Sequence, residues 1–150
     1  MKKYFDNDLF ILDLANNHFG DVKHAVAVVK AMAKVTKAND VNAAIKLQLR
    51  NLDTFVHASM RDSDHRYVRR FLDTSLSIDD FKRITDAIRS EGLTVMATPF
   101  DESSIDNFED LGIEILKIAS ASANDIPLLA AAADTKYPIV ASSGGLTQFE

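Results

Sequence analysis

Short apolar runs alternate along the chain with segments whose apolar residues recur every three or four positions, which predicts repeated βα units. Five runs have the length of strands, at residues 9–15, 43–49, 93–97, 114–118 and 138–142. Because a helical segment separates each strand from the next, the strands are expected to lie parallel in one sheet. The fold class predicted by this alternation is α/β.

Capping residues mark where the intervening helices begin and end. Asp21 and Ser77 each precede a helical pattern and can accept hydrogen bonds from its first N–H groups. Gly92 and Gly112 follow two of these patterns and are expected to end the helices there. The apolar positions expected to face the sheet are Val22, Ala25, Val26, Val29, Ala33, Phe81, Ile84, Ile88, Ile105, Phe108 and Leu111.

Two later helix starts and one long connection complete the predicted arrangement. Either Asn124 or Asp125 can cap the helix before the fifth strand, and Thr147 can cap a helix after it. The connection 50–76 is much longer than is usual between βα units and is rich in charge, so we interpret it as a solvated helical insertion. A short helix is expected around Tyr67. The alternative is a lid or a subunit contact over the carboxyl edge of the sheet.

Composition narrows the class of protein. The 150 residues are 47% hydrophobic and 26% charged, with a net charge of −5 and no cysteine. These values are typical of one globular domain in a reducing compartment. The mild acidity argues against a nucleic-acid partner, and no apolar segment approaches the roughly 20 residues that a membrane span needs. Because the first residues also lack the apolar stretch of a signal peptide, the expected location is the cytoplasm.

Polar residues interrupt the predicted strands near their carboxyl ends. A parallel strand that is covered on both faces should be almost continuously apolar, so each interruption is informative. Two of these residues are lysines and one is an aspartate, and a charge taken out of water is costly unless it is paired. We therefore expect the charged side chains to pair with each other or with a ligand. The interrupting residues are Asp13, Lys46, Gln48, Thr98, Lys117 and Ser142.

These residues point to an anion site, because the carboxyl ends of barrel strands share one mouth where catalytic groups gather. Lys46 and Lys117 can hold the carboxylate and phosphate groups of a small anionic substrate. Asp13 is then their counter-charge or a proton-transfer group. Neutral hydrogen bonds are expected from Gln48, Thr98, Ser120 and Ser142. The alternative interpretation is a structural lysine–aspartate pair beside solvent-facing hydroxyls.

The four histidines give weaker signals. His18 lies in the turn after the first strand, where it can act as a turn or capping residue or meet a ligand. His24, His57 and His65 have no mutual spacing typical of a metal site, so we interpret them as surface residues. No metal ligand is assigned in this sequence.

Five short motifs follow one another at the ends of the predicted strands. They are LDLANNHFGD at 12–21, AIKLQ at 44–48, TPFD at 98–101, LKIAS at 116–120 and SSG at 142–144. In this order they resemble the sialic acid synthase family, whose members condense phosphoenolpyruvate with a hexosamine-derived sugar. The resemblance implies that residues 1–150 form the N-terminal part of a (β/α)8 TIM barrel, about its first five strands, with a long insertion at 50–76.

The resemblance also implies a function and a set of residues. The expected activity is a carbohydrate-biosynthesis transferase that joins phosphoenolpyruvate to a sugar of the N-acetylmannosamine type and releases phosphate. Asp13 is expected to be catalytic, at a position where the family carries a glutamate, and Ser122 stands where the family has a sugar-contacting glutamate. Manganese or magnesium is expected in the full-length enzyme, with ligands outside this chain. The expected substrate-binding residues are Lys46, Gln48, Thr98, Lys117, Ser120, Ser142 and Asn124.

Two other functions stay open at this point. Lys117 lies on an apolar strand, where burial can lower its pKa and make it the Schiff-base nucleophile of an aldolase. The departures at Asp13 and Ser122 also allow a barrel that binds anions without turnover.

A partial barrel predicts how the chain assembles. Strands one and five would each have an unpaired edge, and the inward face, expected to include Ile11 or Leu12, Ile115 and Ile139, would lack its usual neighbours. A homo-oligomer is therefore expected, and the chain alone is expected to be inactive as a synthase.

Overall fold

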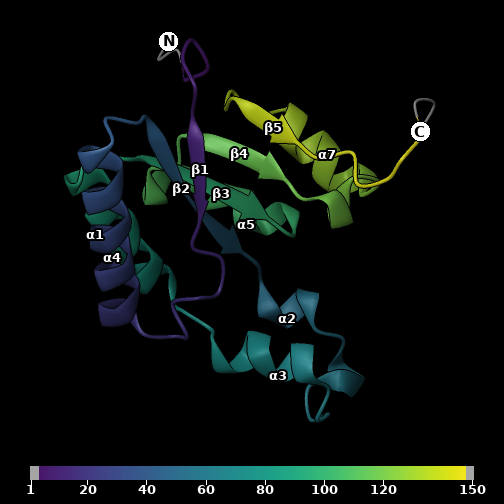
Figure 1. Ribbon diagram of the computed structural model, residues 1–150. Helices are drawn as coiled ribbons and strands as arrows, with labels where there is room; N and C mark the ends of the chain where they lie inside the picture. The colour runs from purple at the N-terminus through teal and green to yellow at the C-terminus, as the bar shows by residue number, and fades with distance from the viewer. Residues whose placement is uncertain (1–3, 148–150) are drawn as a thin grey trace.

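The computed structural model describes residues 4–147 and contains one parallel sheet of five strands in the order β1-β2-β3-β4-β5 (Figure 1). This confirms the α/β class and the place of each predicted strand. A helix beginning at Thr147 would lie outside these residues. The strands are β1 (Phe10–Asp13), β2 (Ala43–Leu49), β3 (Thr94–Pro99), β4 (Ile115–Ile118) and β5 (Ile139–Ala141).

The helices that connect the strands are α1 (Val22–Ala38), α4 (Ile78–Ser90), α5 (Glu102–Asp106), α6 (Phe108–Leu111) and α7 (Ile126–Ala133). Asp21 and Ser77 cap α1 and α4 as predicted. Of the two candidate caps for α7, the side chain of Asp125 accepts the capping hydrogen bond, and Asn124 precedes it. The helix predicted to contain Ile105, Phe108 and Leu111 is instead two short helices. The chain turns at Asn107, which ends α5 and begins α6.

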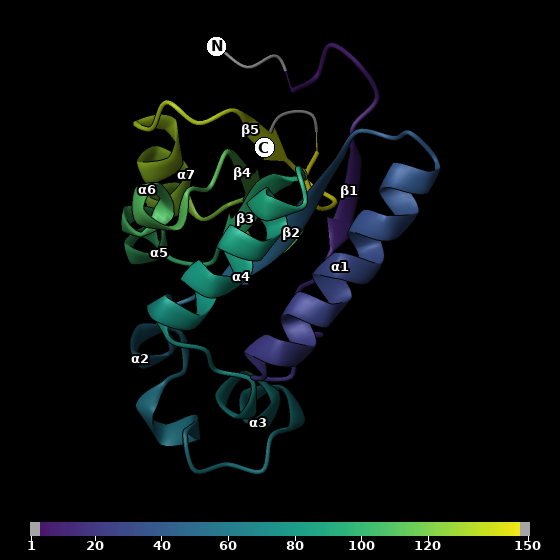
Figure 2. The same cartoon turned by 90° about the vertical axis from the view of Figure 1, so that its left-hand side faces the viewer.

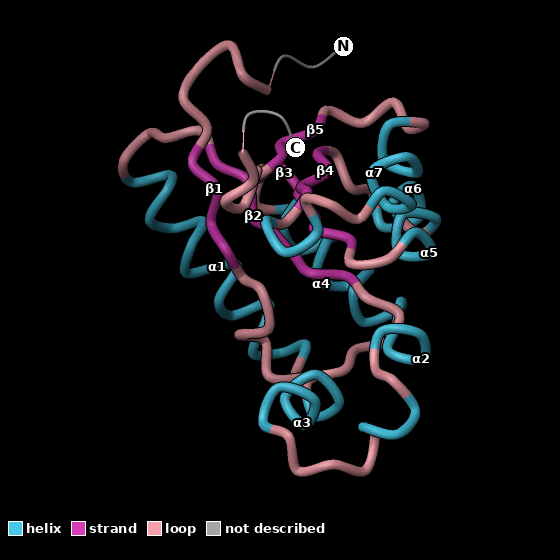
Figure 3. The backbone as a smooth tube through the Cα atoms, turned by 90° about the vertical axis from the view of Figure 1, so that its right-hand side faces the viewer, coloured by secondary structure: helices cyan, strands magenta, loops and turns pink. Residues whose placement is uncertain are grey.

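The connection 50–76 is helical, as predicted. It contains α2 (Leu52–Phe55), a 3-10 helix (Ala58–Met60) and α3 (Arg66–Asp73). Figures 1 and 3 both place α2 and α3 beyond the carboxyl end of β2. The insertion therefore lies at the edge of the sheet to which the sequence assigns the functional residues. Within residues 4–147, no helix is long and apolar enough to cross a membrane.

The helices cover one face of the curved sheet, with α1 and α4 side by side over it (Figure 2). On this outer face, alternate residues of the strands are buried against apolar residues of the helices. Each fully buried leucine or isoleucine contributes about 1.5–3 kcal/mol through the hydrophobic effect, so this layer is the main core. Its largest side chains are Leu14, Ile45, Leu47, Ile84, Ile88, Phe108, Leu111 and Leu116.

The inner face carries a second, smaller apolar cluster at its amino end. Ala44, Met96 and Ile115 are buried there, and Tyr4 and Leu9 pack against them from the segment before β1. The Tyr4 hydroxyl donates a hydrogen bond of 2.9 Å to Glu114, at the start of β4. The segment that precedes β1 thus covers the amino end of the half-barrel, and the carboxyl end is left to polar side chains.

The register corrects one predicted position on the inner face. Ile139 pairs with Leu116, which belongs to the outer core, so the prediction that Ile139 points inward is wrong. Val140 takes that place and packs on the inner cluster. Of the two alternatives on β1, Ile11 pairs with Ala44 and lies on the inner face. The physical reason is the period of two, which allows only every second strand residue to face inward.

Candidate functional site

The polar residues that interrupt the strands share the inner face of the sheet. Asp13 is the register partner of Lys46, and Gln48 is the partner of Thr98. Lys117 lies two residues after the inner residue Ile115, and its partner is Val140. Directly paired residues of parallel strands point to the same side. The two lysines therefore face the same space at the carboxyl end, as the period of two predicts.

Lys46 is held by Asp13 across the two strands. The Lys46 ammonium donates to the Asp13 carboxylate at 2.8 Å. Only 12% of the lysine side chain is exposed, against 52% of the aspartate side chain. Since Asp13 remains half in water, its carboxylate can neutralise Lys46 and still meet a solvent molecule or a ligand.

Lys117 has a different set of partners. Its ammonium donates to the Ser142 hydroxyl at 2.5 Å and to the Ile118 carbonyl at 2.6 Å. Burial lowers the pKa of Lys117, the positive charge of Lys46 lowers it further, and Asp13 acts in the opposite direction. The register places both lysine side chains on the inner face. No ion pair of Lys117 occurs within residues 4–147, so its charge is the less balanced of the two.

Thr98 offers an unused polar group beside the lysines. Its hydroxyl oxygen is buried and makes no hydrogen bond within the described part of the chain. A buried polar atom without a partner is costly, and such atoms are uncommon in native structures. Its position on the inner face beside Gln48 makes the hydroxyl available to a ligand oxygen.

Ser120 and Asn124 lie in the loop that follows β4, and both are exposed. The loop after β5 lies closely over Ser120. A Cβ atom placed on Gly144 would lie 2.5 Å from the Ser120 carbonyl oxygen, and Gly144 has a φ of +60°, so glycine is needed there. This contact brings Ser120 toward the Ser142 loop. No hydrogen bond of the described structure joins Asn124 to the other predicted site residues.

His18 is a buried turn residue. Its ring is 1% exposed, and Nδ1 accepts a hydrogen bond from the Gly20 N–H at 3.1 Å. Burial lowers the pKa of His18, and the positive charge of Arg50 lowers it further. The turn interpretation is therefore confirmed. His24, His57 and His65 are exposed, as predicted.

Sequence reasoning missed Arg50 as a functional candidate. Arg50 follows Gln48 by two positions, and its guanidinium donates to the Gln48 side-chain oxygen at 2.6 Å. A small cavity of about 30 Å³ lies beside both residues and is also lined by Asn16 and His18. The sequence could have identified Arg50, because it lies two positions after Gln48 and therefore on the same side of an extended chain.

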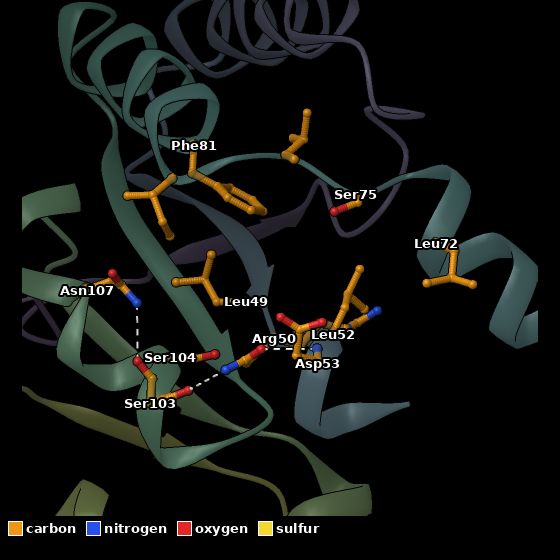
Figure 4. Close-up of a pocket in the computed structure, with 13 residues that line it drawn as sticks. Leu49, Arg50, Leu52, Asp53, Leu72, Ser75, Phe81, Ser103, Ser104 and Asn107 are labelled. Carbon is orange, nitrogen blue, oxygen red and sulfur yellow. Dashed lines mark hydrogen bonds between the residues drawn. The ribbon is translucent and has the colours of Figure 1, made fainter. Parts of the chain in front are cut away.

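A larger cavity lies outside the inner face. It has a volume of about 620 Å³ and lies between the insertion, α4 and α5 (Figure 4). Leu49 and Phe81 line it, and both belong to the helix-covered side of the sheet. None of the predicted site residues lines this cavity. We therefore place the candidate site on the inner face.

The described residues do not fit the divalent metal that the resemblance implies. Between residues 4 and 147, no group of three or more His, Asp or Glu side chains is close enough to hold a metal ion. A site built from protein side chains alone usually has three or more such ligands, so a metal here would need ligands outside residues 4–147.

Comparison with known proteins adds the family. Residues 18–150 match the sequence profile of the NeuB family. The chain belongs to the NeuB family. One relative of this NeuB chain is the N,N'-diacetyllegionaminic acid synthase of Legionella pneumophila, which is 30% identical over 143 residues. That match covers 89% of this chain and 39% of the synthase.

Two solved structures have the same fold as this NeuB chain. A spore coat polysaccharide biosynthesis protein E from Chromobacterium violaceum is 42% identical with a TM-score of 0.91, over 95% of this chain and 43% of that one. The N-acetylneuraminic acid synthetase of Leptospira borgpetersenii is 26% identical with a TM-score of 0.75, over 93% of this chain and 46% of that one. The NeuB chain thus spans less than half the length of these relatives and has the fold of a partial α/β barrel.

Proposed function

We propose that this chain supplies the phosphoenolpyruvate site of a nonulosonic acid synthase, which condenses phosphoenolpyruvate with an amino sugar of the N-acetylmannosamine type. The family supports a synthase of the sialic or legionaminic acid type. The observation that carries the proposal is the pair of lysines, Lys46 and Lys117, facing one space beside hydrogen-bonding groups. The related synthetase from Leptospira borgpetersenii was solved in complex with citrate, another small polyanion.

The proposed binding mode uses charge first. Phosphoenolpyruvate carries a carboxylate and a phosphate, and two ammonium groups can offset both in a site with little water. Lys117 has no carboxylate partner within residues 4–147, so it is assigned to the more highly charged phosphate. Lys46 remains close to Asp13 and is assigned to the carboxylate. Gln48, Thr98 and Ser142 provide neutral hydrogen bonds that fix the orientation of the substrate.

The proposed chemistry is carbon–carbon bond formation at the methylene of phosphoenolpyruvate. That carbon attacks the aldehyde carbon of the sugar, and the aldehyde oxygen takes up a proton. Water then adds to the carbon that carries the phosphate ester, and the carbon–oxygen bond breaks to release phosphate. Asp13 is assigned to position this water and accept its proton, because its carboxylate is half exposed and held in place by Lys46. Manganese or magnesium remains part of the proposal, with ligands outside residues 4–147.

A second function is favoured by one observation, the lowered pKa of Lys117. A lysine that loses its proton more easily can attack the carbonyl of pyruvate and form a Schiff base. Borohydride treatment in the presence of pyruvate tests this directly by mass spectrometry. A 1-carboxyethyl group on Lys117, the product of reducing the pyruvate Schiff base, would favour the aldolase over the synthase.

Calorimetric titration with phosphoenolpyruvate tests the proposed function. Lys46→Ala and Lys117→Ala should each weaken binding by about 1.5–3 kcal/mol, the range for hydrogen bonds to charged groups. Lys82→Ala is the matched control, because Lys82 is an exposed lysine that pairs with Asp86 on α4. Unchanged affinity in both site variants would refute the assignment. If a longer protein that contains this chain binds phosphoenolpyruvate but releases no phosphate from it, a barrel that binds anions without turnover is favoured.

A further inference from the structure

Arg50 makes a hydrogen bond that fixes which way the Gln48 amide points. The Arg50 guanidinium donates to the Gln48 side-chain oxygen at 2.6 Å. A guanidinium has five N–H donors and no acceptor, so only the oxygen end of the amide can face it. This removes the usual ambiguity between the oxygen and nitrogen of a glutamine amide. The NH₂ group of Gln48 is therefore directed away from Arg50.

The orientation has a chemical consequence for the site. With its oxygen directed at Arg50, Gln48 presents the two N–H donors of its NH₂ group to a ligand. A donor fits the carboxylate, phosphate or ester oxygens of an anion, and an amide with the opposite orientation would repel them. Arg50 thus determines whether Gln48 favours or opposes anion binding.

Arg50 is itself held by three aromatic rings. Its guanidinium carbon lies 4.4 Å from the ring centre of Phe71, 4.6 Å from Phe100 and 5.3 Å from Phe55. We call these three residues the aromatic cage. Phe55 and Phe71 belong to the insertion, in α2 and α3, and Phe100 directly follows β3. The cage therefore connects the insertion to the carboxyl ends of β2 and β3 through one side chain.

The charge of Arg50 is unusual because, among the described residues, no carboxylate lies at ion-pair distance from its guanidinium. The Asp101 carboxylate acts on it from farther away and raises its pKa, against the larger effect of burial. The Arg50 Nε is buried without a hydrogen-bond partner in the same part of the chain. Burial lowers its pKa to about 10, so it remains a cation at neutral pH. Ring faces offset part of this cost, because a cation–π contact is stronger when the cation is removed from water. An apolar residue would fill the same cage at lower cost, which argues that Arg50 serves the site.

We infer that Arg50 is a positioning residue, which orients the Gln48 amide as a donor and couples that orientation to docking of the insertion through the aromatic cage. The inference rests on the proposed function for the identity of the anion. It makes the insertion part of the binding site without any direct contact between α3 and the ligand.

A double-mutant cycle tests the inference by calorimetry with phosphoenolpyruvate. Gln48→Met and Arg50→Met should each weaken binding roughly tenfold, about the value of one lost hydrogen bond to a charged group. If Arg50 acts through Gln48, the double variant should bind no more weakly than the single ones. Arg66→Met is the matched control, because Arg66 lies 4.5 Å from the Tyr67 ring on the exposed side of the same insertion. Effects that add fully in the double variant would overturn the inference.

A second measurement does not depend on any ligand. The sequence contains only two glutamines, Gln48 and Gln148, so the side-chain amide signals of Gln48 can be assigned by one substitution in an NMR spectrum. Arg50→Met and Phe71→Leu should both shift these signals and speed their hydrogen exchange, and Arg66→Met should leave them in place. Unchanged signals in Phe71→Leu and in a folded Arg50→Met variant would overturn the inference. Absence of phosphoenolpyruvate binding by the unsubstituted protein, together with these shifts, would refute the proposed function and leave the role of Arg50 standing.

Discussion

The carboxylate of Asp13 lies 2.8 Å from the ammonium of Lys46, and the two residues are direct register partners on neighbouring strands. Lys117 lies on the same face, and its partners within residues 4–147 are the Ser142 hydroxyl and the Ile118 carbonyl. The inner face thus holds one neutralised cation and one that is not neutralised. This asymmetry predicts that the three charges have different effects on anion binding and on stability.

Asp13→Asn should tighten phosphoenolpyruvate binding by this chain and abolish turnover in a longer protein that contains it. Removing the carboxylate leaves both lysine charges available to the anion. The gain should be on the order of 1 kcal/mol, roughly fivefold in affinity, because Asp13 is half exposed and water screens its charge. Calorimetry on the variant and the unsubstituted protein measures the difference.

Asp53→Asn is the control for Asp13→Asn, because Asp53 is an exposed aspartate that pairs with Arg61 in the insertion. It should leave the affinity unchanged. Weaker binding in Asp13→Asn would mean that the carboxylate orients Lys46 more than it competes with the ligand.

Lys117→Met should raise the stability of the protein and weaken phosphoenolpyruvate binding. Burial and Lys46 both disfavour the charged form of Lys117, and a methionine of similar length removes that cost. Thermal unfolding at neutral pH should show a higher midpoint for the variant. A lower midpoint would mean that the hydrogen bonds of Lys117 to Ser142 and Ile118 outweigh the cost of its charge.

The same pKa shift predicts how stability and binding depend on pH. The pKa of Lys117 is lower in the folded state than in the unfolded state, so between the two values the unfolded state binds more protons. The free energy of unfolding should therefore rise with pH between the folded-state and unfolded-state pKa values of Lys117. Phosphoenolpyruvate binding should fall over the lower part of this pH range, because the ammonium loses its charge. Lys117→Met should remove the contribution of this residue to the pH dependence of stability, which denaturant titrations at several pH values can measure.

The sequence predicted the inner face well because strand alternation is a local property. Lys46 and Gln48 are two positions apart on one strand, so the sequence alone places their side chains on the same face. The prediction that Ile139 faces inward was inconsistent with this alternation. Ser142 was placed on the inner face, and Ile139 lies three positions before it, an odd number, so the two residues cannot share a face. The aromatic cage around Arg50 was beyond sequence reasoning, because Phe71 and Phe100 meet it only through the tertiary fold.

The 150-residue chain by itself should release no phosphate from phosphoenolpyruvate in the presence of N-acetylmannosamine and manganese. Its described residues include no group that can hold the metal, and five strands enclose only part of a barrel mouth. A phosphate-release assay measures this, with a longer NeuB protein as the positive control. Robust turnover by the chain alone would show that the inner face is a complete active site.

The edges and the inner face of the half-barrel predict that this chain associates with itself. Among the described residues, β1 has a single hydrogen-bonded neighbour, β2, and β5 pairs only with β4. Apolar side chains remain in water at both edges, with Phe10 51%, Ile11 39% and Ile139 42% exposed. Burying this surface stabilises a complex by roughly 25 cal/mol per Å², and unpaired strand edges favour pairing with another chain.

Light scattering at micromolar concentration should therefore give a mass of at least twice 16.6 kDa. Ile11→Lys should lower that mass, because a charge on an edge strand opposes pairing with a second chain. Val35→Lys is the matched control, since Val35 is an exposed valine on helix α1 and does not belong to an edge strand. In such a dimer, Asp13 and Ser142 would lie near the subunit boundary, because Asp13 is the last residue of β1 and Ser142 directly follows β5. A monodisperse monomer that unfolds cooperatively would contradict the prediction and would mean that the half-barrel is stable with both edges open.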